Sequence, residues 1–394
     1  MNDLQSNKHK NIYSDNRTKK YIREIRVEDL LFRKTVQIID QKTKDYYNDK
    51  VILITGGGGS IGSQICRELA KMSPKKLIIL DISENGAYNI AQEIHFQYKT
   101  NIQIEIATVC DRREIDKIFD KHKPEIVIHA AAHKHVPLME NNCCEAVKNN
   151  VFGTLNVVET AEKYKVKKFI QISTDKAVNP TNVMGATKRL CEVIIQSKKD
   201  SETSFTAIRF GNVLGSSGSV IPLFKYQIAN GGPVTITDKR IIRYFMTIPE
   251  ASQLVLESGA MAKNGELYVL DMGEPVKILD LAEKMIKLSG FEPYKDIDIV
   301  EVGLRPGEKL YEELLIKTEE LDKTSNKKIY IERDRPKDKE VISYKLDMLK
   351  KALITDDDLI VKETMKKVVS TYHSPEEVNS LGIKITKSED IMVG

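Results

Sequence analysis

The stretch VILITGGGGSIGSQI, residues 51–65, decides the fold of this chain of 394 residues. Its first five residues form a short, largely β-branched run that predicts a buried strand. Gly57, Gly59 and Gly62 then give the pattern G-x-G-x-x-G between that strand and an amphipathic helix. Such glycines allow a tight turn and let a pyrophosphate approach the backbone, where the helix N-terminus offers free N–H groups. The stretch therefore predicts the phosphate-binding loop of a dinucleotide site.

Four further apolar runs follow this strand, and each has the length of a strand buried on both faces. Segments with helical spacing lie between them, and in residues 60–72 the apolar side chains recur every three or four positions. This alternation predicts an α/β fold with a doubly wound parallel sheet, the Rossmann arrangement. The four runs are KLIIL (76–80), IQIEIA (102–107), EIVIHAAA (125–132) and KFIQIS (168–173).

The alternation loosens after residue 211, where clusters of glycine and serine such as GSSGSV mark loops. We therefore expect the sheet domain to end there and a smaller C-terminal lobe to bind the substrate. The charged last sixty residues show no motif for chemistry. The expected regions are a polar, partly helical arm (1–47), the cofactor-binding domain (48–211), the mainly substrate-binding lobe (212–335) and a charged helical extension (336–394).

Composition argues against several classes of protein. The net charge of +4 arises in the first 50 residues, which hold 12 Lys/Arg and 8 Asp/Glu, so the rest lacks the basic surplus of a nucleic-acid-binding domain. No apolar run approaches the roughly 20 residues of a membrane-spanning helix, and no signal-peptide core is present. We therefore expect no integral membrane segment and a cytoplasmic location. The five cysteines and the pair His133 and His135 lack the spacing of a metal site, so no metal is expected.

Two carboxylates stand where the adenosine half of a dinucleotide would lie. Asp81 ends the second strand, nineteen residues after Gly62. A carboxylate at this position accepts hydrogen bonds from the ribose hydroxyls and repels a 2′-phosphate, so it predicts NAD rather than NADP. Asp111 follows the third strand, where its carboxylate could meet the adenine amino group.

The glycine loop also carries a more specific pattern. Thr55-Gly56-x-x-Gly59-x-x-Gly62 resembles the loop of the short-chain dehydrogenase/reductase superfamily, in its extended branch, which modifies nucleotide sugars. In that superfamily the fifth strand ends in Ser or Thr, and the next helix carries Tyr-x-x-x-Lys. The spacing places both side chains on one helix face. The lysine lowers the pKa of the tyrosine, so that the phenolate can accept a proton from a sugar hydroxyl.

The corresponding segment here is STDKAVNPTNVMGATKR, residues 173–189. Thr174 and Lys188 fill two of the three positions, but Met184 stands at the position of the tyrosine. One interpretation is that the site is degenerate and that the protein only binds a dinucleotide. The other is that different groups carry the proton transfer.

The neighbouring residues Asp175 and Lys176 favour the second interpretation. They directly follow the strand, at the carboxyl edge of the sheet where ligands bind in such folds. An acid beside an amine suits a dehydration, because the C5 proton must be removed while the C6 oxygen leaves as water. A simple oxidation or a 4-epimerisation does not need this pair.

Seven ordered motifs resemble the UDP-N-acetylglucosamine 4,6-dehydratases of capsule and glycan biosynthesis, over about residues 22 to 330. Some members of this family carry tyrosine in the catalytic helix, whereas others, mostly larger membrane-anchored ones, carry methionine. Met184 is therefore similar to a family variant, and the methionine members imply that the configuration at C5 is retained. The segment IREIRVEDLLFR resembles the part just ahead of the catalytic domain in the larger members. The motifs are LITGGGGSIGSQICREL, HAAAHKHVPLMENN, NNVFGT, STDKAVNPTNVMGATKR, RFGNVLGSSGSVIPLF, RYFMTIPEA and GLRPGEKLYEEL.

The resemblance implies a mechanism. NAD⁺ accepts a hydride from sugar C4 and returns it to C6, so the cofactor is regenerated. Lys176 removes the C5 proton and Asp175 protonates the departing C6 hydroxyl. Lys188 holds the nicotinamide ribose and Thr174 hydrogen-bonds the sugar O4. Because Met184 has no ionisable group, water, Asp175 or Lys176 must accept the O4 proton.

The family also implies contacts with a UDP-sugar. His133 and Lys134 would face the nicotinamide and the sugar. Asn212 and Arg243 would contact the diphosphate and the sugar. Arg305 would contact a phosphate, and Glu308 would contact the uridine ribose. Arginine offers a planar fork to phosphate oxygens. The predicted catalytic residues are Thr174, Asp175, Lys176, Met184 and Lys188, and the predicted cofactor-binding residues are Thr55, Gly56, Gly57, Gly59, Ser60, Ile61, Gly62, Asp81, Asp111, Ala130, Ala131 and Lys188.

Two other functions remain open at this point. A UDP-hexosamine 4-epimerase could use the same scaffold without Asp175 and Lys176, and a non-catalytic protein could bind NAD without turnover. The helices expected near 144–164 and 183–200 resemble those through which the superfamily forms dimers, so a homo-oligomer is expected.

Overall fold

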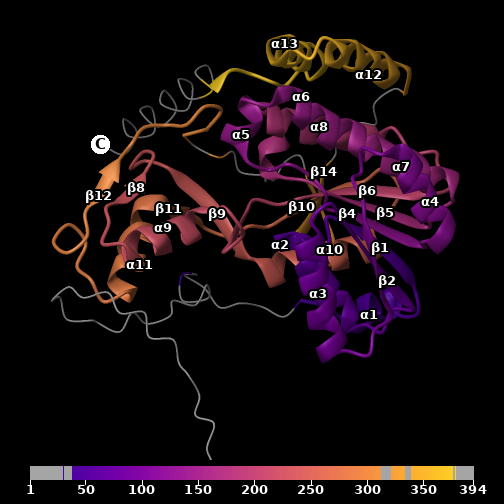
Figure 1. Cartoon of the computed structure of the whole chain (residues 1–394), viewed down its shortest axis with the longest axis horizontal. Coiled ribbons are helices and arrows are strands. Elements are labelled where there is room, and N and C mark those ends of the chain that lie inside the picture. The colour runs from indigo at the N-terminus through magenta and orange to yellow at the C-terminus, as the bar shows by residue number, and fades with distance from the viewer. Residues whose placement is uncertain are drawn as a thin grey trace, which may run out of the picture.

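The computed structural model describes residues 30, 38–310, 312, 321–332, 339–375 and 378. Its centre is a nine-stranded sheet in the order β13-β14-β10-β6-β5-β4-β1-β2-β3, with helices on both faces (Figure 1). The seven strands from β10 to β3 run parallel, and β13 and β14 are antiparallel additions. The predicted doubly wound parallel sheet is thereby confirmed. These strands are β1 (Val51–Thr55), β2 (Lys76–Asp81), β3 (Ile102–Ile106), β4 (Ile126–His129), β5 (Lys168–Ile172), β6 (Ser204–Arg209), β10 (Leu267–Leu270), β13 (Leu321–Lys323) and β14 (Ile329–Glu332).

Strand β1 shows why helices cover both faces. Ile52 and Ile54 pack into a core with α2, α3 and α10, whereas Leu53 packs into a second core with α4, α7 and α8. Successive side chains of a strand point to opposite faces, so an entirely apolar strand needs a cover on each. The first face carries α1 (Gln41–Tyr47), α2 (Ser60–Ala70), α3 (Glu84–Gln97) and α10 (Ile248–Met261), and the second carries α4 (Arg112–His122), α5 (Val136–Glu140), α6 (Cys143–Ala146), the π-helix η2 (Val147–Gly153), α7 (Thr154–Lys163) and α8 (Val183–Gln196).

A smaller lobe with its own core lies beside the sheet (Figure 1). Phe224 and Met285 are fully buried in this core. The lobe contains the sheet of β7 (Asn212–Leu214), β9 (Ile242–Thr247) and β11 (Pro275–Lys277), the strand pair β8 (Val234–Ile236) and β12 (Ile299–Glu301), and the helices α9 (Val220–Ala229) and α11 (Ile278–Leu288).

The predicted boundaries need two corrections. The chain returns from the lobe to the main sheet, because β10 pairs with β6 and satisfies the backbone groups of an otherwise free edge. Residues 212–335 therefore do not form one unit. The N-terminal arm is also shorter than predicted: Tyr47 of α1 is fully buried, and its hydroxyl donates to the Leu256 carbonyl at 2.9 Å. Residues 1–29 and 31–37 lie outside the described part of the chain, and with them most of IREIRVEDLLFR.

The C-terminal helices α12 (Lys339–Ile354) and α13 (Asp358–Val368) pair with each other and cover α6 and α8, as the yellow ribbons in Figure 1 show. Leu349 and Met365 are fully buried in the core beneath them. The hairpin thus covers part of a helix expected to form a dimer contact, and the homo-oligomer stays a prediction. In the part of the chain that the structure describes, no helix has the length and apolar character needed to cross a bilayer.

Candidate active site

The glycine loop lies at the point where the strand order reverses, between β1 and β4. A Cβ on Gly62 would lie 2.1 Å from the Gly56 carbonyl oxygen, and one on Gly56, whose φ is +67°, would lie 2.6 Å from the Ala131 nitrogen. Both positions therefore exclude side chains. Gly59 differs, because it is the exposed N-cap of α2 and caps it with no side chain. The loop leaves the helix N-terminus accessible to an anionic group.

The predicted adenosine carboxylates have different surroundings. Asp81 accepts hydrogen bonds from the backbone N–H groups of Gly58 and Ser83, both at 2.8 Å, which fixes it beside the glycine loop. Asp111 caps α4 by accepting from the N–H groups of its first turn. Asp111 thus has a structural role of its own, and its contact with adenine stays a prediction.

A buried polar network behind the loop was not foreseen from the sequence. His129 Nδ1 lies 2.6 Å from Thr55 Oγ1, and its Nε2 lies 2.9 Å from Thr154 Oγ1. Burial, assisted by the charge of Lys188, lowers the pKa of His129 to about 3, so the imidazole is neutral. The network ties β1, β4 and α7 together. Its only sequence signal is a histidine inside the apolar run EIVIHAAA.

Lys188 is buried on α8, and within the described part of the chain it makes no hydrogen bond or ion pair with another side chain or carbonyl. Burial lowers its pKa. A buried ammonium without a partner is costly, and ribose hydroxyls are suitable acceptors. Together with the exposed N-terminus of α2, Lys188 fits the predicted dinucleotide.

Charged side chains gather where β5 ends. Asp175 and Lys176 form the short helix η3 (Asp175–Ala177), and Lys176 Nζ lies 3.0 Å from Asp175 Oδ1. The same Nζ lies 3.0 Å from Glu312 Oε1 and donates to Asn212 Oδ1 at 3.2 Å. Thr174 Oγ1 donates to Asp175 Oδ1 at 2.8 Å. Sequence reasoning missed Glu312, although it stands in the quoted motif GLRPGEKLYEEL.

The protonation of this cluster follows from its burial and its charges. Burial opposes ionisation of Asp175, but the charge and hydrogen bonds of Lys176 outweigh it and lower the pKa of Asp175. Burial also opposes the Lys176 ammonium, but the charges of Asp175 and Glu312 outweigh it and raise its pKa well above the ordinary value. Burial and the nearby Asp175 raise the pKa of Glu312. In the resting protein Asp175 is therefore a carboxylate and Lys176 an ammonium.

Arg243 connects this cluster to the RPGEK motif. Its Nε lies 3.2 Å from Glu312 Oε1 and its Nη2 lies 3.5 Å from Glu308 Oε1. Asn212 Nδ2 donates to the other oxygen of Glu312 at 2.9 Å. The structure thus brings three predicted residues, Lys176, Asn212 and Arg243, around one glutamate, and a fourth, Glu308, contacts Arg243. We call Asp175, Lys176, Glu312 and Arg243 the charged cluster.

The RPGEK loop is tied directly to the catalytic segment. The Gly307 carbonyl accepts hydrogen bonds from Thr181 and Asn182, and Lys309 Nζ donates to the Asn179 carbonyl at 2.8 Å. Arg305 is exposed, and its backbone N–H donates to Glu308. Two motifs about 125 residues apart therefore form one wall of the site, and the phosphate contact of Arg305 stays a prediction.

Three other predicted residues make no hydrogen bond or ion pair with the charged cluster in the part of the chain that the structure describes. His133 is 43% exposed and its ring faces Glu145 at 3.5 Å. Lys134 Nζ donates to Ser216 Oγ at 3.4 Å, and burial and the charge of Lys176 lower its pKa. Met184 lies in the first turn of α8 with its side chain buried in the core, so no ionisable group replaces the tyrosine there.

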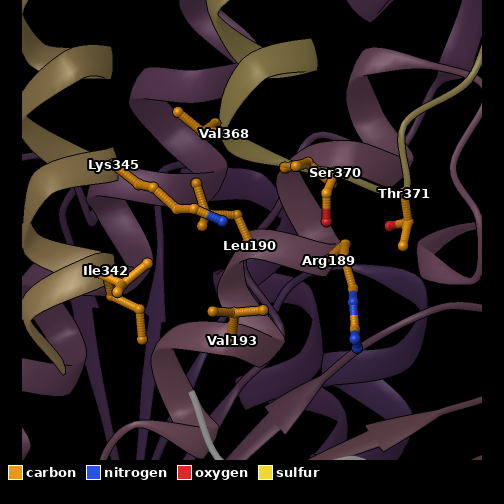
Figure 2. A pocket seen from close by; sticks show the side chains of 10 residues that line it. Arg189, Leu190, Val193, Ile342, Lys345, Val368, Ser370 and Thr371 are labelled. Carbon is orange, nitrogen blue, oxygen red and sulfur yellow. The ribbon is translucent and has the colours of Figure 1, made fainter. Parts of the chain in front are cut away.

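A cavity of about 280 Å³ lies between α8 and the C-terminal helices (Figure 2). Figure 2 shows Leu190 and Val193 of α8 facing Ile342, with Arg189 and Lys345 at its sides. None of the predicted site residues lines it. This cavity is therefore separate from the candidate active site.

Comparison with known proteins agrees with this geometry. Residues 52–334 match the family described as "Polysaccharide biosynthesis protein". The chain belongs to this family. The solved structure of Pen from Bacillus thuringiensis is 36% identical in sequence and has a TM-score of 0.68. The match covers 74% of this chain and 93% of Pen. The structural neighbours confirm the predicted extended short-chain dehydrogenase/reductase fold.

Relatives in sequence agree with the predicted resemblance. The capsular polysaccharide biosynthesis protein CapD of Staphylococcus aureus is 51% identical over 353 residues, which are 89% of this chain but 58% of CapD, so the chain spans little more than half of that relative. A UDP-N-acetylglucosamine 4,6-dehydratase (inverting) of Campylobacter jejuni is 34% identical over 68% of this chain and 77% of its own length. Nucleotide-sugar epimerases also occur at this level of identity.

Proposed function

We propose that this protein catalyses the NAD-dependent 4,6-dehydration of UDP-N-acetylglucosamine to a UDP-4-keto-6-deoxy sugar for polysaccharide synthesis. The contact between Asp175 and Lys176 at the carboxyl edge of the sheet carries this proposal. An epimerase needs no such acid–amine pair, whereas a dehydratase must both remove a C5 proton and deliver one to the C6 oxygen. The dehydratase name of a relative gives further support.

The bound NAD⁺ would supply hydride chemistry, oxidising C4 to a ketone and later reducing C6. The C4 ketone acidifies the C5–H bond. Lys176, in its amine form, removes the C5 proton as the C6–O bond breaks and a C5–C6 double bond forms. Lys176 then returns that proton to C5.

Asp175 is suited to move the remaining proton. The oxidation at C4 releases one proton from O4, and the departing C6 hydroxyl needs one proton to leave as water, so a single carboxylate can carry it. Thr174 and Lys176 hold Asp175 Oδ1. Asp175 Oδ2 is buried and receives no hydrogen bond within the described residues. This oxygen is our candidate for the O4 proton acceptor that Met184 cannot be.

The direct test is to incubate the protein with UDP-N-acetylglucosamine and to look by mass spectrometry for the loss of one water. The dehydratase proposal predicts that product, with NAD neither consumed nor released. Formation of UDP-N-acetylgalactosamine without water loss would instead identify the epimerase. Bound NAD without any change in the sugar would identify a non-catalytic binder.

The configuration of the product at C5 needs a separate measurement. We propose retention, because the methionine at residue 184 is similar to the variant found in retaining family members. The Campylobacter relative is named as an inverting enzyme. Proton coupling constants of the product, measured by NMR immediately after mixing, distinguish the two outcomes.

A further inference from the structure

The proposed dehydration leaves one feature of the charged cluster without a role. Two carboxylates, Asp175 and Glu312, lie 3.0 Å from a single amine, Lys176. Asp175 suffices as the proton carrier of the reaction. Yet Glu312 is equally close and nearly fully buried, with a side chain 5% exposed.

Glu312 has a polar partner at each of its oxygens, a hydrogen bond at Oε2 and ion pairs at Oε1. Asn212 Nδ2 donates to Oε2 at 2.9 Å, and Arg243 Nε lies 3.2 Å from Oε1, the oxygen that faces Lys176. A carboxylate fixed in this way acts on Lys176 through its charge and its position. The charge matters, because a base at C5 must be a neutral amine, whereas a neighbouring anion favours the ammonium.

We propose that Glu312 is a positioning residue for Lys176: it holds the amine beside Asp175 and sets the pH above which Lys176 can act as a base. Arg243 contacts the same Glu312 oxygen and is itself predicted to bind the substrate diphosphate. This control of Lys176 is therefore linked to substrate binding. The inference rests on the proposed function for its catalytic meaning, but the ion pair itself can be measured without turnover.

The charged groups that face Lys176 come from four parts of the chain. Asp175 neighbours it on η3, Glu312 follows the RPGEK loop, Arg243 lies on β9, and Lys134 lies on the loop after β4. The two carboxylates raise the pKa of Lys176, whereas Arg243 lowers it. Lys134 is a further cation, and burial together with the charge of Lys176 lowers its pKa. Removal of the Glu312 charge therefore lowers the pKa of Lys176.

The test is the pH dependence of kcat/KM for water loss from UDP-N-acetylglucosamine. In Glu312→Gln we expect the acidic limb of this profile to move to lower pH by about one unit or more, the usual effect of an opposite charge at this distance. Glu202→Gln is the matched control, because Glu202 is exposed and pairs with Lys165 at the surface, and its limb should coincide with that of the wild type. A purely structural Glu312 would lower the rate at every pH without moving the limb, and that result would overturn the proposal.

A second measurement does not depend on activity. NMR titration of the wild type and of Glu312→Gln with ¹³Cε-labelled lysine, assigned with Lys176→Arg, should give Lys176 a midpoint above the ordinary value of 10.5 in the wild type and a lower midpoint in Glu312→Gln. The same midpoint in both proteins would show that Glu312 does not control the amine. If the wild type removes no water from UDP-N-acetylglucosamine, the proposed function fails, and this titration still decides the role of Glu312.

Discussion

The glycine loop and the charged cluster lie at the same edge of the sheet, but they hold their shapes by opposite means. In the loop, Gly56 and Gly62 pack so closely against backbone that a single added carbon would lie under 3 Å from it. In the cluster, long charged side chains reach one another from segments as distant as residues 175 and 312. The loop depends on missing side chains and close backbone packing, whereas the cluster depends on the chemistry of long side chains.

This difference predicts that the two regions fail separately. Changes at the tightly packed glycines of the loop, Gly56 and Gly62, should affect cofactor binding and stability together, because backbone packing supports both. Changes in the cluster should affect catalysis and leave NAD bound. The following variants test that separation, from the largest expected effect to the smallest.

Lys176→Ala should have the largest effect, with turnover reduced by roughly 10²- to 10⁴-fold, the usual contribution of a positioned acid or base. Exchange of the C5 proton with deuterated solvent should stop, while NAD remains bound. Mass spectrometry measures the exchange. Lys165→Ala is the control, because that lysine is exposed and pairs with Glu202 at the surface. Persistent C5 exchange in Lys176→Ala would show that another group is the base.

Gly62→Ala should lose NAD binding and destabilise the fold by about 1–3 kcal/mol, because its Cβ would overlap the Gly56 carbonyl. Gly59→Ala is the matched control: its Cβ would lie 3.3 Å from the same oxygen, so the thermal midpoint should barely change. NAD affinity should still fall in Gly59→Ala, because the added methyl group lies at the exposed N-terminus of α2. Equal thermal midpoints for Gly62→Ala and the wild type would refute the packing argument.

His129 should make the free energy of unfolding depend on pH. Its pKa of about 3 in the folded protein lies below the ordinary 6.5, so the unfolded chain binds the proton more tightly. Stability is therefore complete above pH 6.5 and falls as the pH drops toward 3, by about 2 kcal/mol at pH 5. Urea unfolding at pH 7 and pH 5 measures this loss, which His129→Asn should abolish. The same pH dependence in both proteins would argue against a neutral buried imidazole.

Asp81→Asn should have the smallest effect, a loss of NAD affinity of about tenfold, or 1.4 kcal/mol. Asparagine still accepts the hydrogen bond from Gly58 but no longer repels a 2′-phosphate. The ratio of the dissociation constants for NADP and NAD, measured by calorimetry, should therefore fall. An unchanged ratio would mean that Asp81 does not select the cofactor.

Sequence reasoning succeeded where structure follows from neighbouring residues. The strand–loop–helix at 51–65, the parallel sheet and the pair of Asp175 and Lys176 all depend on local patterns. It failed where distant segments meet. The return of β10 to the edge of β6 and the burial of Tyr47 leave no local pattern, and the network of His129 leaves only a histidine in an apolar run, because each is set by what packs against it.

Glu312 shows the same limit within the site. Its motif was recognised, but nothing in GLRPGEKLYEEL distinguishes Glu312 from Glu313 beside it. Only the folded chain shows that Glu312 faces Lys176 and shares Arg243.

The sequence by itself determined the fold class and the family, because glycine spacing and apolar periodicity act over a few residues. Only the tertiary structure decided which charges surround Lys176 and where its pKa lies. The pKa of a buried amine is the balance between its desolvation and the charges within a few ångströms, and those charges come from segments whose proximity the order of residues does not reveal.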